Sequence, residues 1–198
     1  MPVYEPSEPE LFNDYVPQMP KFEAPKKSKT NRKEDDLQKY AKIEADVKFL
    51  LEKMATALEL DIISNQDKKP AIKRLRMLDD IDNALMKDDY HETFTNMNGS
   101  YVLSQWLMPL PDGSYPNAKI VHTILRCINR LNIRKDEIGE KEYHELESYV
   151  EMYKAGSGGA SHKDCQSLAR NILNSWYRHR DNVEMRYDEG IGFDKGWR

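Results

Sequence analysis

The sequence predicts an all-α protein, a compact right-handed bundle or solenoid-like stack of about seven or eight helices. Three observations predict this class. Apolar residues recur three and four positions apart through most of the chain after Glu34, as amphipathic helices require. No alternating apolar and polar run is long enough to form a sheet. The connections between the periodic segments are short, so consecutive helices are expected to pack as neighbours.

We divide the chain into a disordered tail (1–33), a helical domain (34–180) and a flexible C-terminal tail (181–198). The 198 residues are 39% hydrophobic and 32% charged, which is typical of a soluble domain with a tail. No apolar run approaches the roughly eighteen residues of a membrane span, and the N-terminus does not resemble a secretory signal. Two cysteines, Cys127 and Cys165, form no disulfide framework and favour a reducing compartment.

The tail has two halves of opposite charge. Six prolines and little apolar area favour disorder over residues 1–33. Residues 1–24 hold five acids against one base, with four aromatic residues, whereas residues 25–33 (PKKSKTNRK) hold five bases and no acid. The basic run is either a nuclear import signal or a solvated linker. The acidic-aromatic stretch at 10–17 (ELFNDYVP) resembles a ligand motif, which would bind either another such domain or the chain itself.

The first half of the domain contains two long apolar stripes of helical period. The stripe of the first helix consists of Ile43, Val47, Leu50, Met54, Ala57 and Leu58. The second helix opens at Asp67 and Pro70, because proline is tolerated in the first turn of a helix. Its stripe runs through Ile72, Leu75 and Leu78, and Ile81, Ala84 and Leu85 continue it, either directly or after a break at Asp79-Asp80.

The second half contains four further helical segments. A turn with Tyr90 and Phe94 leads to a helix after Gly99 with Val102, Leu103, Trp106 and Leu107. The most regular stripe consists of Ile120, Ile124, Cys127, Ile128 and Leu131. Another helix is marked by Tyr143, Leu146, Val150 and Tyr153. The glycine-rich loop AGSGGAS at 155–161 precedes the last helix, which carries Leu168, Ile172, Leu173 and Trp176.

Residues 106–117 (WLMPLPDGSYPN) are predicted to be a rigid connector between two helices. Proline removes a backbone donor and fixes φ, and Asp-Gly favours a turn. Trp106 and Leu107 are expected to end one helix inside the core, while Leu110 and Pro111 cover the helix ends. With Trp176 of the last helix, these four residues are the predicted structural anchors.

The residues that carry chemistry do not form a catalytic or metal-binding motif, so we expect no enzyme activity, metal or cofactor. His144 and Glu145 begin like the zinc motif HExxH, but position 148 is serine. Cys127 lies in an apolar stripe and is predicted to be a core residue. Cys165 has only one histidine nearby, which is a weak indication of a nucleophile. The three glycines of the 155–161 loop follow no strand, so a linker is favoured over a phosphate loop.

The bases are unevenly distributed along the chain. Residues 117–135 contain five bases and no acid: Lys119, Arg126, Arg130, Arg134 and Lys135. Solvated helix faces explain any one of them, but the unbroken run favours a surface for an acidic partner, either an acidic peptide or nucleic acid. Few aromatic residues interleave with these bases, which disfavours single-stranded nucleic acid. The net charge of −4 also counts against direct nucleic-acid binding.

Two stretches resemble a known family. Residues 68–81 (KKPAIKRLRMLDDI) and 104–133 (SQWLMPLPDGSYPNAKIVHTILRCINRLNI), with the late Trp176, resemble the TFIIS N-terminal-type domain of the Iws/Spn family of transcription elongation factors. The resemblance covers about residues 36–180, and the PLPDGSxPN core is its most specific part. The sequence departs from the family after Trp176, where Tyr-Arg-His-Arg replaces the usual Arg-Pro-Ile and a glycine.

The resemblance implies a nuclear, non-enzymatic scaffold that binds disordered segments of transcription proteins. Its main partner would be the elongation factor and histone chaperone Spt-six (Spt6), which travels with RNA polymerase II. Other transcription factors with acidic-aromatic motifs would be further partners. A nucleic-acid- or histone-binding helical module acting in chromatin is the alternative.

By analogy with the family, we expect an apolar pocket where the loop after the first helix meets the loop after the 117–131 helix. The pocket residues would be Ile63, Asn65, Asp67, Lys68, Leu131, Ile133 and Lys135. A basic face would steer the acids of the partner, and it would consist of Lys119, His122, Arg126 and Arg130. The pocket would set affinity, because a buried aromatic contributes about 2–3 kcal/mol and an exposed ion pair less than about 1 kcal/mol.

Overall fold

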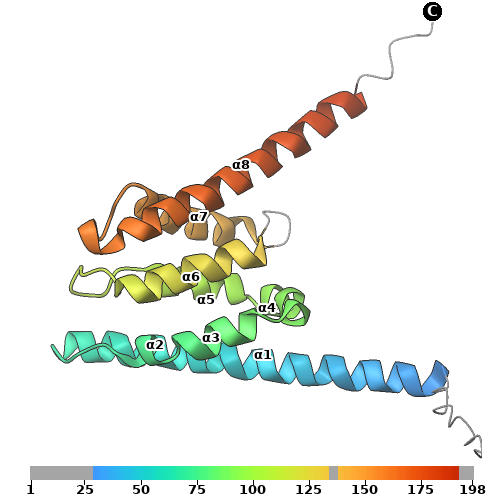
Figure 1. Ribbon diagram of the computed structural model, residues 1–198, viewed down its shortest axis with the longest axis horizontal. Coiled ribbons are helices and arrows are strands. Elements are labelled where there is room, and N and C mark those ends of the chain that lie inside the picture. The colour runs from blue at the N-terminus through green and yellow to red at the C-terminus, as the bar shows by residue number, and fades with distance from the viewer. Residues whose placement is uncertain (1–28, 134–137, 192–198) are drawn as a thin grey trace, which may run out of the picture.

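The computed structural model describes residues 29–133 and 138–191, and for residues 29–33, 160 and 179–191 it describes the backbone alone. Over these residues the chain forms eight α-helices, two short 3-10 helices and no strand (Figure 1). The elements are α1 (Lys29–Gln66), α2 (Lys73–Arg76), α3 (Leu78–Leu85), η1 (Asp88–Tyr90), α4 (His91–Asn96), α5 (Gly99–Leu107), α6 (Ala118–Leu131), α7 (Glu140–Lys154), η2 (Gly159–His162) and α8 (Lys163–Ile191). The all-α prediction is confirmed.

The helices form a stack in which successive elements run back and forth. The long helix α1 lies along one side, and α2 and α3 return along it (Figure 1). Helices α5 and α6 form the middle of the stack, and α7 and α8 pack on its far side. Because the elements alternate in direction, the α1–α2 loop, the connector and the α7–α8 turn all lie at one end of the molecule, at the left in Figure 1.

Two predicted boundaries differ from the structure. Helix α1 begins at Lys29, so it includes the last five residues of the segment predicted to be a tail. Helix α8 continues to Ile191, eleven residues beyond the predicted end of the domain at 180. Both stretches are mostly polar and lack proline, so no proline prevents the helix from continuing. The acidic half of the tail lies outside the described residues.

The core forms along the predicted stripes. The stripe of α1 from Ile43 to Ala57 is buried, and so are seven residues of α6. Trp106 and Leu107 are fully buried and Trp176 nearly so. Burying a side chain of this size contributes about 1.5–3 kcal/mol. Leu110, by contrast, is only half-buried and Pro111 is exposed, so Pro111 does not belong to the core as we predicted.

A buried ion pair joins α1 to α2. Asp61 and Arg74 have side chains 0% and 1% exposed, and Arg74 Nε donates to Asp61 Oδ2 over 3.1 Å. Asp61 also accepts hydrogen bonds from the backbone N–H groups of Lys73 and Arg74, which begin the short α2. The carboxylate therefore caps a helix that has no side-chain cap of its own. Arg74 therefore belongs to the interior of the domain and not to its surface.

The connector begins at the end of α5, inside the core, where the last backbone carbonyl groups of the helix must find hydrogen-bond donors. Proline at 109 prevents α5 from continuing, so its last carbonyl groups need other partners. Arg74 Nη1 donates to the carbonyl oxygen of Trp106 over 3.2 Å, and the Tyr153 hydroxyl donates to that of Leu107 over 2.9 Å. Two distant helices thus satisfy the carbonyls that the proline leaves without helical partners.

Candidate partner-binding surface

The connector turns the chain through a small network of hydrogen bonds. The N–H of Gly113 donates to the carbonyl of Leu110, and the N–H of Leu110 donates to the carbonyl of Ser114, each over 2.8 Å. Gly113 has a φ of +80°, a conformation that glycine adopts at no steric cost. Asp112 Oδ1 accepts from the backbone N–H of Ser114 at 2.9 Å and from its hydroxyl at 2.6 Å. The Asp-Gly turn predicted from the sequence is therefore held by its own side chains.

This turn is fastened to the end of α1. The backbone N–H of Asp112 donates to Asn65 Oδ1 over 3.2 Å. The hydrogen bonds from Ser114 and Asn65 lower the pKa of the Asp112 carboxyl below its ordinary value. Lys68 has a φ of 58°, the left-handed conformation common just after a helix ends. The α1–α2 loop and the connector consequently form one continuous rim.

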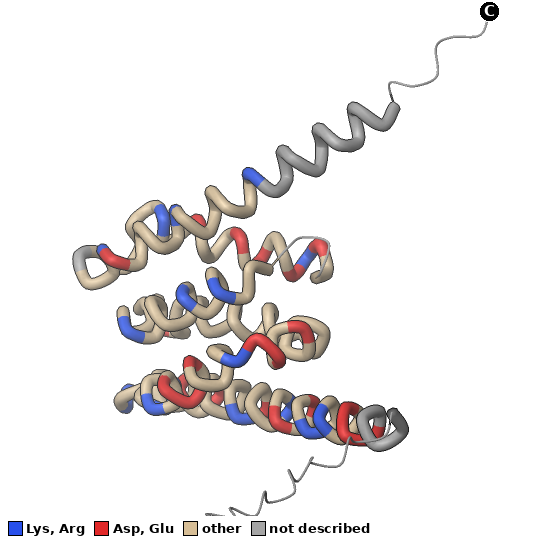
Figure 2. The backbone as a smooth tube through the Cα atoms, turned by 45° about the vertical axis from the view of Figure 1, so that its right-hand side comes forward, with Lys and Arg blue, Asp and Glu red and all other residues tan. Residues whose placement is uncertain are grey.

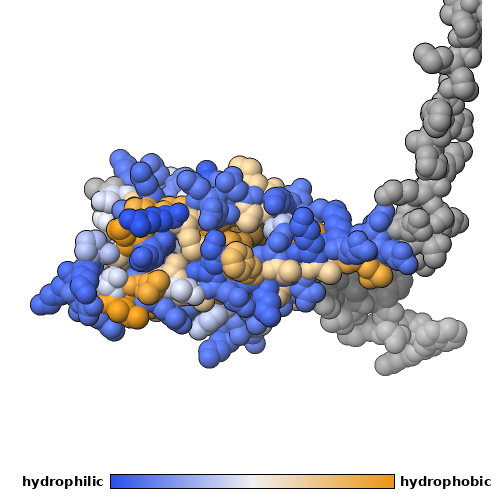
Figure 3. Space-filling model, turned by 90° about the horizontal axis from the view of Figure 1, so that it is seen from below, coloured by the Kyte–Doolittle hydropathy of each residue, from blue (hydrophilic) through white to orange (hydrophobic). Residues whose placement is uncertain are grey.

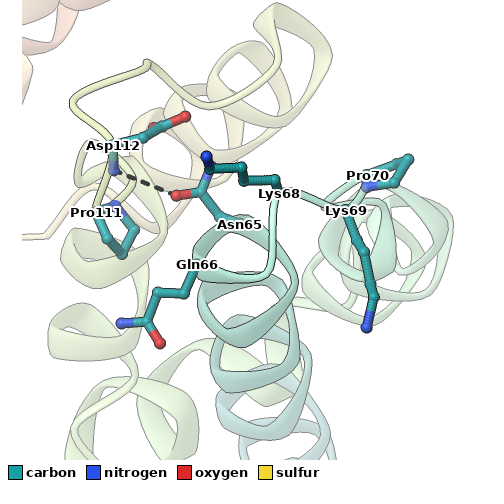
Figure 4. Close-up of a pocket in the computed structure, with 7 residues that line it drawn as sticks. All are labelled: Asn65, Gln66, Lys68, Lys69, Pro70, Pro111 and Asp112. Atoms are coloured by element: carbon teal, nitrogen blue, oxygen red, sulfur yellow. Dashed lines mark hydrogen bonds between the residues drawn. The ribbon is translucent and has the colours of Figure 1, made fainter.

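A groove of about 680 Å³ lies along this rim. Figure 4 shows its lining, which comes from the end of α1, the α1–α2 loop and the connector. The lining residues are Asn65, Gln66, Lys68, Lys69, Pro70, Pro111 and Asp112. Lys69 pairs with Asp67 over 3.0 Å, and both side chains are exposed, so this ion pair holds little free energy. The groove offers two prolines, side-chain amides, lysine ammonium groups and the Asp112 carboxylate to a ligand.

On the other side of the connector, an aromatic cluster joins it to the α7–α8 turn. Tyr115 is 40% exposed and packs edge-to-face on Tyr153 and His162, with ring centroids 6.3 and 6.4 Å away. His162 is buried, and its Nε2 lies 2.9 Å from the carbonyl oxygen of Pro116. His162 also stacks on Tyr153 at 5.7 Å. The sequence analysis did not single out Tyr115 or His162, because only the fold brings the 155–162 segment against the connector.

We call the α1–α2 loop (67–72), the connector (108–117) and the α7–α8 turn (155–162) together the loop end. A second groove, of about 390 Å³, opens beside it, where α6 and α8 begin. Its lining includes Lys119, His122 and Cys165, together with the acids Asp79 and Asp164. Lys119 and His122 are exposed, as expected for a surface that meets an acidic partner.

The predicted pocket between the α1–α2 loop and the loop after α6 is wrong. The α1–α2 loop meets the connector, which precedes α6, whereas Leu131 and Ile133 follow the far end of that helix (Figure 1). A helix of 14 residues is about 21 Å long, so the two sites are well separated. Ile133 is fully buried and Leu131 is 9% exposed, so neither offers a free surface. Lys135 lies outside the described residues, and Ile63 is 52% exposed on α1.

The predicted basic face is smaller than the sequence indicates. The charged residues of helix α6 are all basic, as Figure 2 shows. However, Arg126 and Arg130 both pair with Asp82 of α3, over 2.6 and 3.2 Å. Asp82 is 17% exposed, and sharing it neutralises part of the charge of the two arginines. Lys119 and His122 remain as the part of this face that lies closest to the loop end.

The described residues contain no group of three or more histidine, cysteine or acidic side chains placed to hold a metal ion. Both cysteines are buried, and burial raises the pKa of the Cys127 and Cys165 thiols to about 11. Among the described helices, none has the length and apolar character that crossing a lipid bilayer requires.

The fold and this surface define a stacked all-α domain whose loop end carries lysines, aspartates and an aromatic cluster. No family model matches the chain. The chain is similar to the protein named IWS1 homolog 2 of Arabidopsis thaliana, with 31% identity over 151 residues, 72% of this chain and 35% of the relative. It is also 26% identical to transcription factor iws1 of Schizosaccharomyces pombe over 169 residues, 85% of this chain and 38% of the relative.

A solved structure has the same fold. In the crystal structure of an Spt6–Iws1(Spn1) complex from Encephalitozoon cuniculi, a chain superposes with a TM-score of 0.63 at 22% identity, covering 69% of this chain and 96% of that one. The chain belongs to the Iws1/Spn1 family. It spans about a third of the length of the curated relatives that it matches.

Proposed function

We propose that this domain is the non-enzymatic scaffold of a nuclear transcription elongation factor, and that it binds an acidic, aromatic-bearing disordered segment of the histone chaperone Spt6. Through this contact it would couple Spt6 to elongating RNA polymerase II. The observation that carries the proposal is the likeness to a chain of a crystallised Spt6–Iws1(Spn1) complex. The names of the relatives, transcription factors of the Iws1 type, support the same assignment.

We place the binding surface at the loop end. Its turn and rim are fixed by hydrogen bonds within the connector and to Asn65, so a ligand would meet a preformed surface and little ordering entropy would be lost. Tyr115 offers a partly exposed ring to apolar groups of the ligand. Lys68 and Lys119 border the two grooves and would meet its acids.

The apolar contact and the cations should contribute differently. Covering the ring of Tyr115 stabilises a complex by up to about 1.5–3 kcal/mol, whereas an exposed ion pair adds less than about 1 kcal/mol. The ring would therefore set much of the affinity. The lysines would set the association rate and its dependence on salt.

The test is fluorescence anisotropy with a labelled acidic segment of Spt6 from the same organism. We expect Tyr115→Ala to weaken binding by roughly 10-fold or more. Its matched control is Tyr101→Ala, since Tyr101 is 45% exposed at the start of α5, away from the loop end. Equal affinity of Tyr115→Ala and the unaltered chain would exclude the connector as the apolar contact.

A double charge reversal tests the cations. Lys68→Glu with Lys119→Glu should weaken binding by roughly 10-fold at low salt and flatten its salt dependence. The control reverses the same charge at Lys42 and Lys48, which are exposed on α1. If both pairs weaken binding equally, net charge rather than the loop end attracts the ligand.

The alternative, binding of nucleic acid or histones, would draw on the basic residues of α6. The sharing of Asp82 by Arg126 and Arg130 leaves this face with less free charge, which favours the peptide ligand. Binding of duplex DNA that falls steeply with salt and ignores Tyr115→Ala would favour the alternative.

A further inference from the structure

A third groove, with apolar residues in its lining, lies between α1 and α2, beside the core. It has a volume of about 430 Å³ and is formed by one face of α1 together with α2 and the residue that follows it. Helices α1 and α2 and the residue after α2 line it with Phe49, Glu52, Lys53, Thr56, Ala57, Leu60, Lys73 and Met77. Figure 3, which views the molecule from the side of α1, shows patches of apolar residues on a mostly hydrophilic surface.

The apolar residues of this groove are unusually exposed for their type. Phe49 is 62% exposed and Leu60 is 41% exposed. Positions 49, 53, 56 and 60 follow the spacing of one helix face, so they form a continuous stripe along α1. This stripe runs beside the buried stripe of Ile43 to Ala57, and Ala57 itself also lines the groove. An exposed apolar stripe beside a groove is typical of a docking surface.

A lysine lies on each side of the apolar residues of this groove. Lys53 of α1 lies over the ring of Phe49, with Nζ 5.1 Å from the ring centroid. Its ion pair with Asp80 is long, 3.8 Å, and exposed, so a ligand carboxylate could replace it at little cost. Lys73 faces the groove from α2. A ligand that fits should carry a large apolar group between two acids.

We propose that residues 10–17 of this chain (ELFNDYVP) dock in this groove. The apolar pair Leu11 and Phe12 lies between Glu10 and Asp14. The pair would contact the apolar residues of the groove, and the two acids would meet its two lysines. The surrounding residues 1–24 carry five acids against one base, so the whole segment is attracted to a groove with two lysines and one glutamate.

The chain between the segment and the domain is long enough. Phe12 lies seventeen positions before Lys29, where α1 begins, and in extended form this stretch spans up to about 55–60 Å. From Lys29 to Phe49 the helix rises by about 30 Å. The segment can therefore reach the groove of its own molecule, where tethering raises its effective concentration to about the millimolar range. A second copy would have to bind through this narrow stripe, whereas stable interfaces bury about 1,200–2,000 Å².

Paramagnetic relaxation enhancement in the full chain tests this proposal. A nitroxide label is attached to Ser7→Cys, since the native Cys127 and Cys165 are buried and should stay unlabelled. We expect the amide signals of Thr56, Leu60 and Met77 to be at least halved in the oxidised sample. Broadening confined to the first turns of α1 would overturn the proposal.

Two controls make the result specific. Phe12→Ser should restore the groove signals, whereas Tyr4→Ser, outside the 10–17 segment, should leave them broadened. Neither residue lies in the helical domain, so neither change disturbs its folding. A mixture of labelled chain with isotope-enriched, unlabelled chain should show no broadening. Broadening in that mixture would mean that a second copy occupies the groove, and it would overturn docking within one molecule.

Discussion

Removing the guanidinium of Arg74 is predicted to destabilise the domain far more than removing an exposed one. In Arg74→Met, Asp61 would stay 0% exposed and keep only its two backbone donors, while the carbonyl of Trp106 would lose its donor. Breaking a buried ion pair by removing one partner costs about 3–5 kcal/mol. Domains of this kind are stable by about 5–15 kcal/mol, so the loss is a large part of the total.

The measurement is urea unfolding followed by circular dichroism. With a urea dependence of about 1–3 kcal/mol per molar, the midpoint should fall by at least about 1 M. The matched control is Arg126→Met, because Arg126 pairs with Asp82 but is 45% exposed, and Asp82 keeps Arg130 as a partner. This control should cost less than about 1 kcal/mol.

Similar midpoints for the two variants would refute the reasoning. They would mean that the ion pair inside the stack contributes no more than one on the surface. An unchanged slope with urea is also required, because a changed slope would indicate an altered unfolded or native state rather than a lost interaction.

Three further predictions concern the fold and the connector. Gly99→Ala should destabilise the domain by about 1–3 kcal/mol in the same urea assay, since an added methyl group would collide with the Phe94 ring; an unchanged midpoint would contradict this. The Asp112 carboxyl should titrate below its ordinary pKa of 3.8 in an NMR titration, so its contribution is present above that pH and is lost as the pH falls through the lowered value; a midpoint at or above 3.8 would contradict this. Because burial raises the pKa of Cys127 and Cys165 to about 11, a thiol reagent at neutral pH should react slowly with the folded chain and rapidly in urea; equal rates would show that the thiols are accessible.

The helices and their buried faces could be predicted from the sequence because periodicity reports them directly. The stripe of α6 from Ile120 to Leu131 is buried as a unit, and Trp106 and Leu107 are fully buried at the end of α5. The limits of α1 and α8 could not be predicted in the same way. Polar residues without proline permit a helix but do not form an apolar stripe that would mark it.

The candidate site depended on features that periodicity does not report. A stripe identifies the inward face of a helix, but not which loops meet at its ends. The predicted pocket therefore joined Ile63 to Ile133, whereas the connector is the neighbour of the α1–α2 loop. Ion pairs between residues far apart in the sequence cannot be predicted from periodicity either. Arg126 and Asp82 are 44 residues apart in the chain, and their contact removes cations that the sequence assigns to the surface.

The fold also places lysines and exposed apolar side chains on two separate surfaces, which composition alone could not distinguish. The loop end carries Tyr115 and Lys68 on fixed turns, with Lys119 beside it at the start of α6, and we propose this surface for the segment of Spt6. The groove of α1 carries Phe49 and Leu60 between lysines, and we propose it for the tail of the chain itself. Because the two surfaces share no residue, variants of one leave the other intact.

The most direct test of the proposed function is a chemical-shift titration of the isotope-enriched chain with the acidic segment of Spt6. The amides of Asn65, Asp112, Tyr115 and Lys119 should shift together and saturate at a single affinity. The account would be contradicted if the segment left these four amides unchanged, whether it shifted others or none.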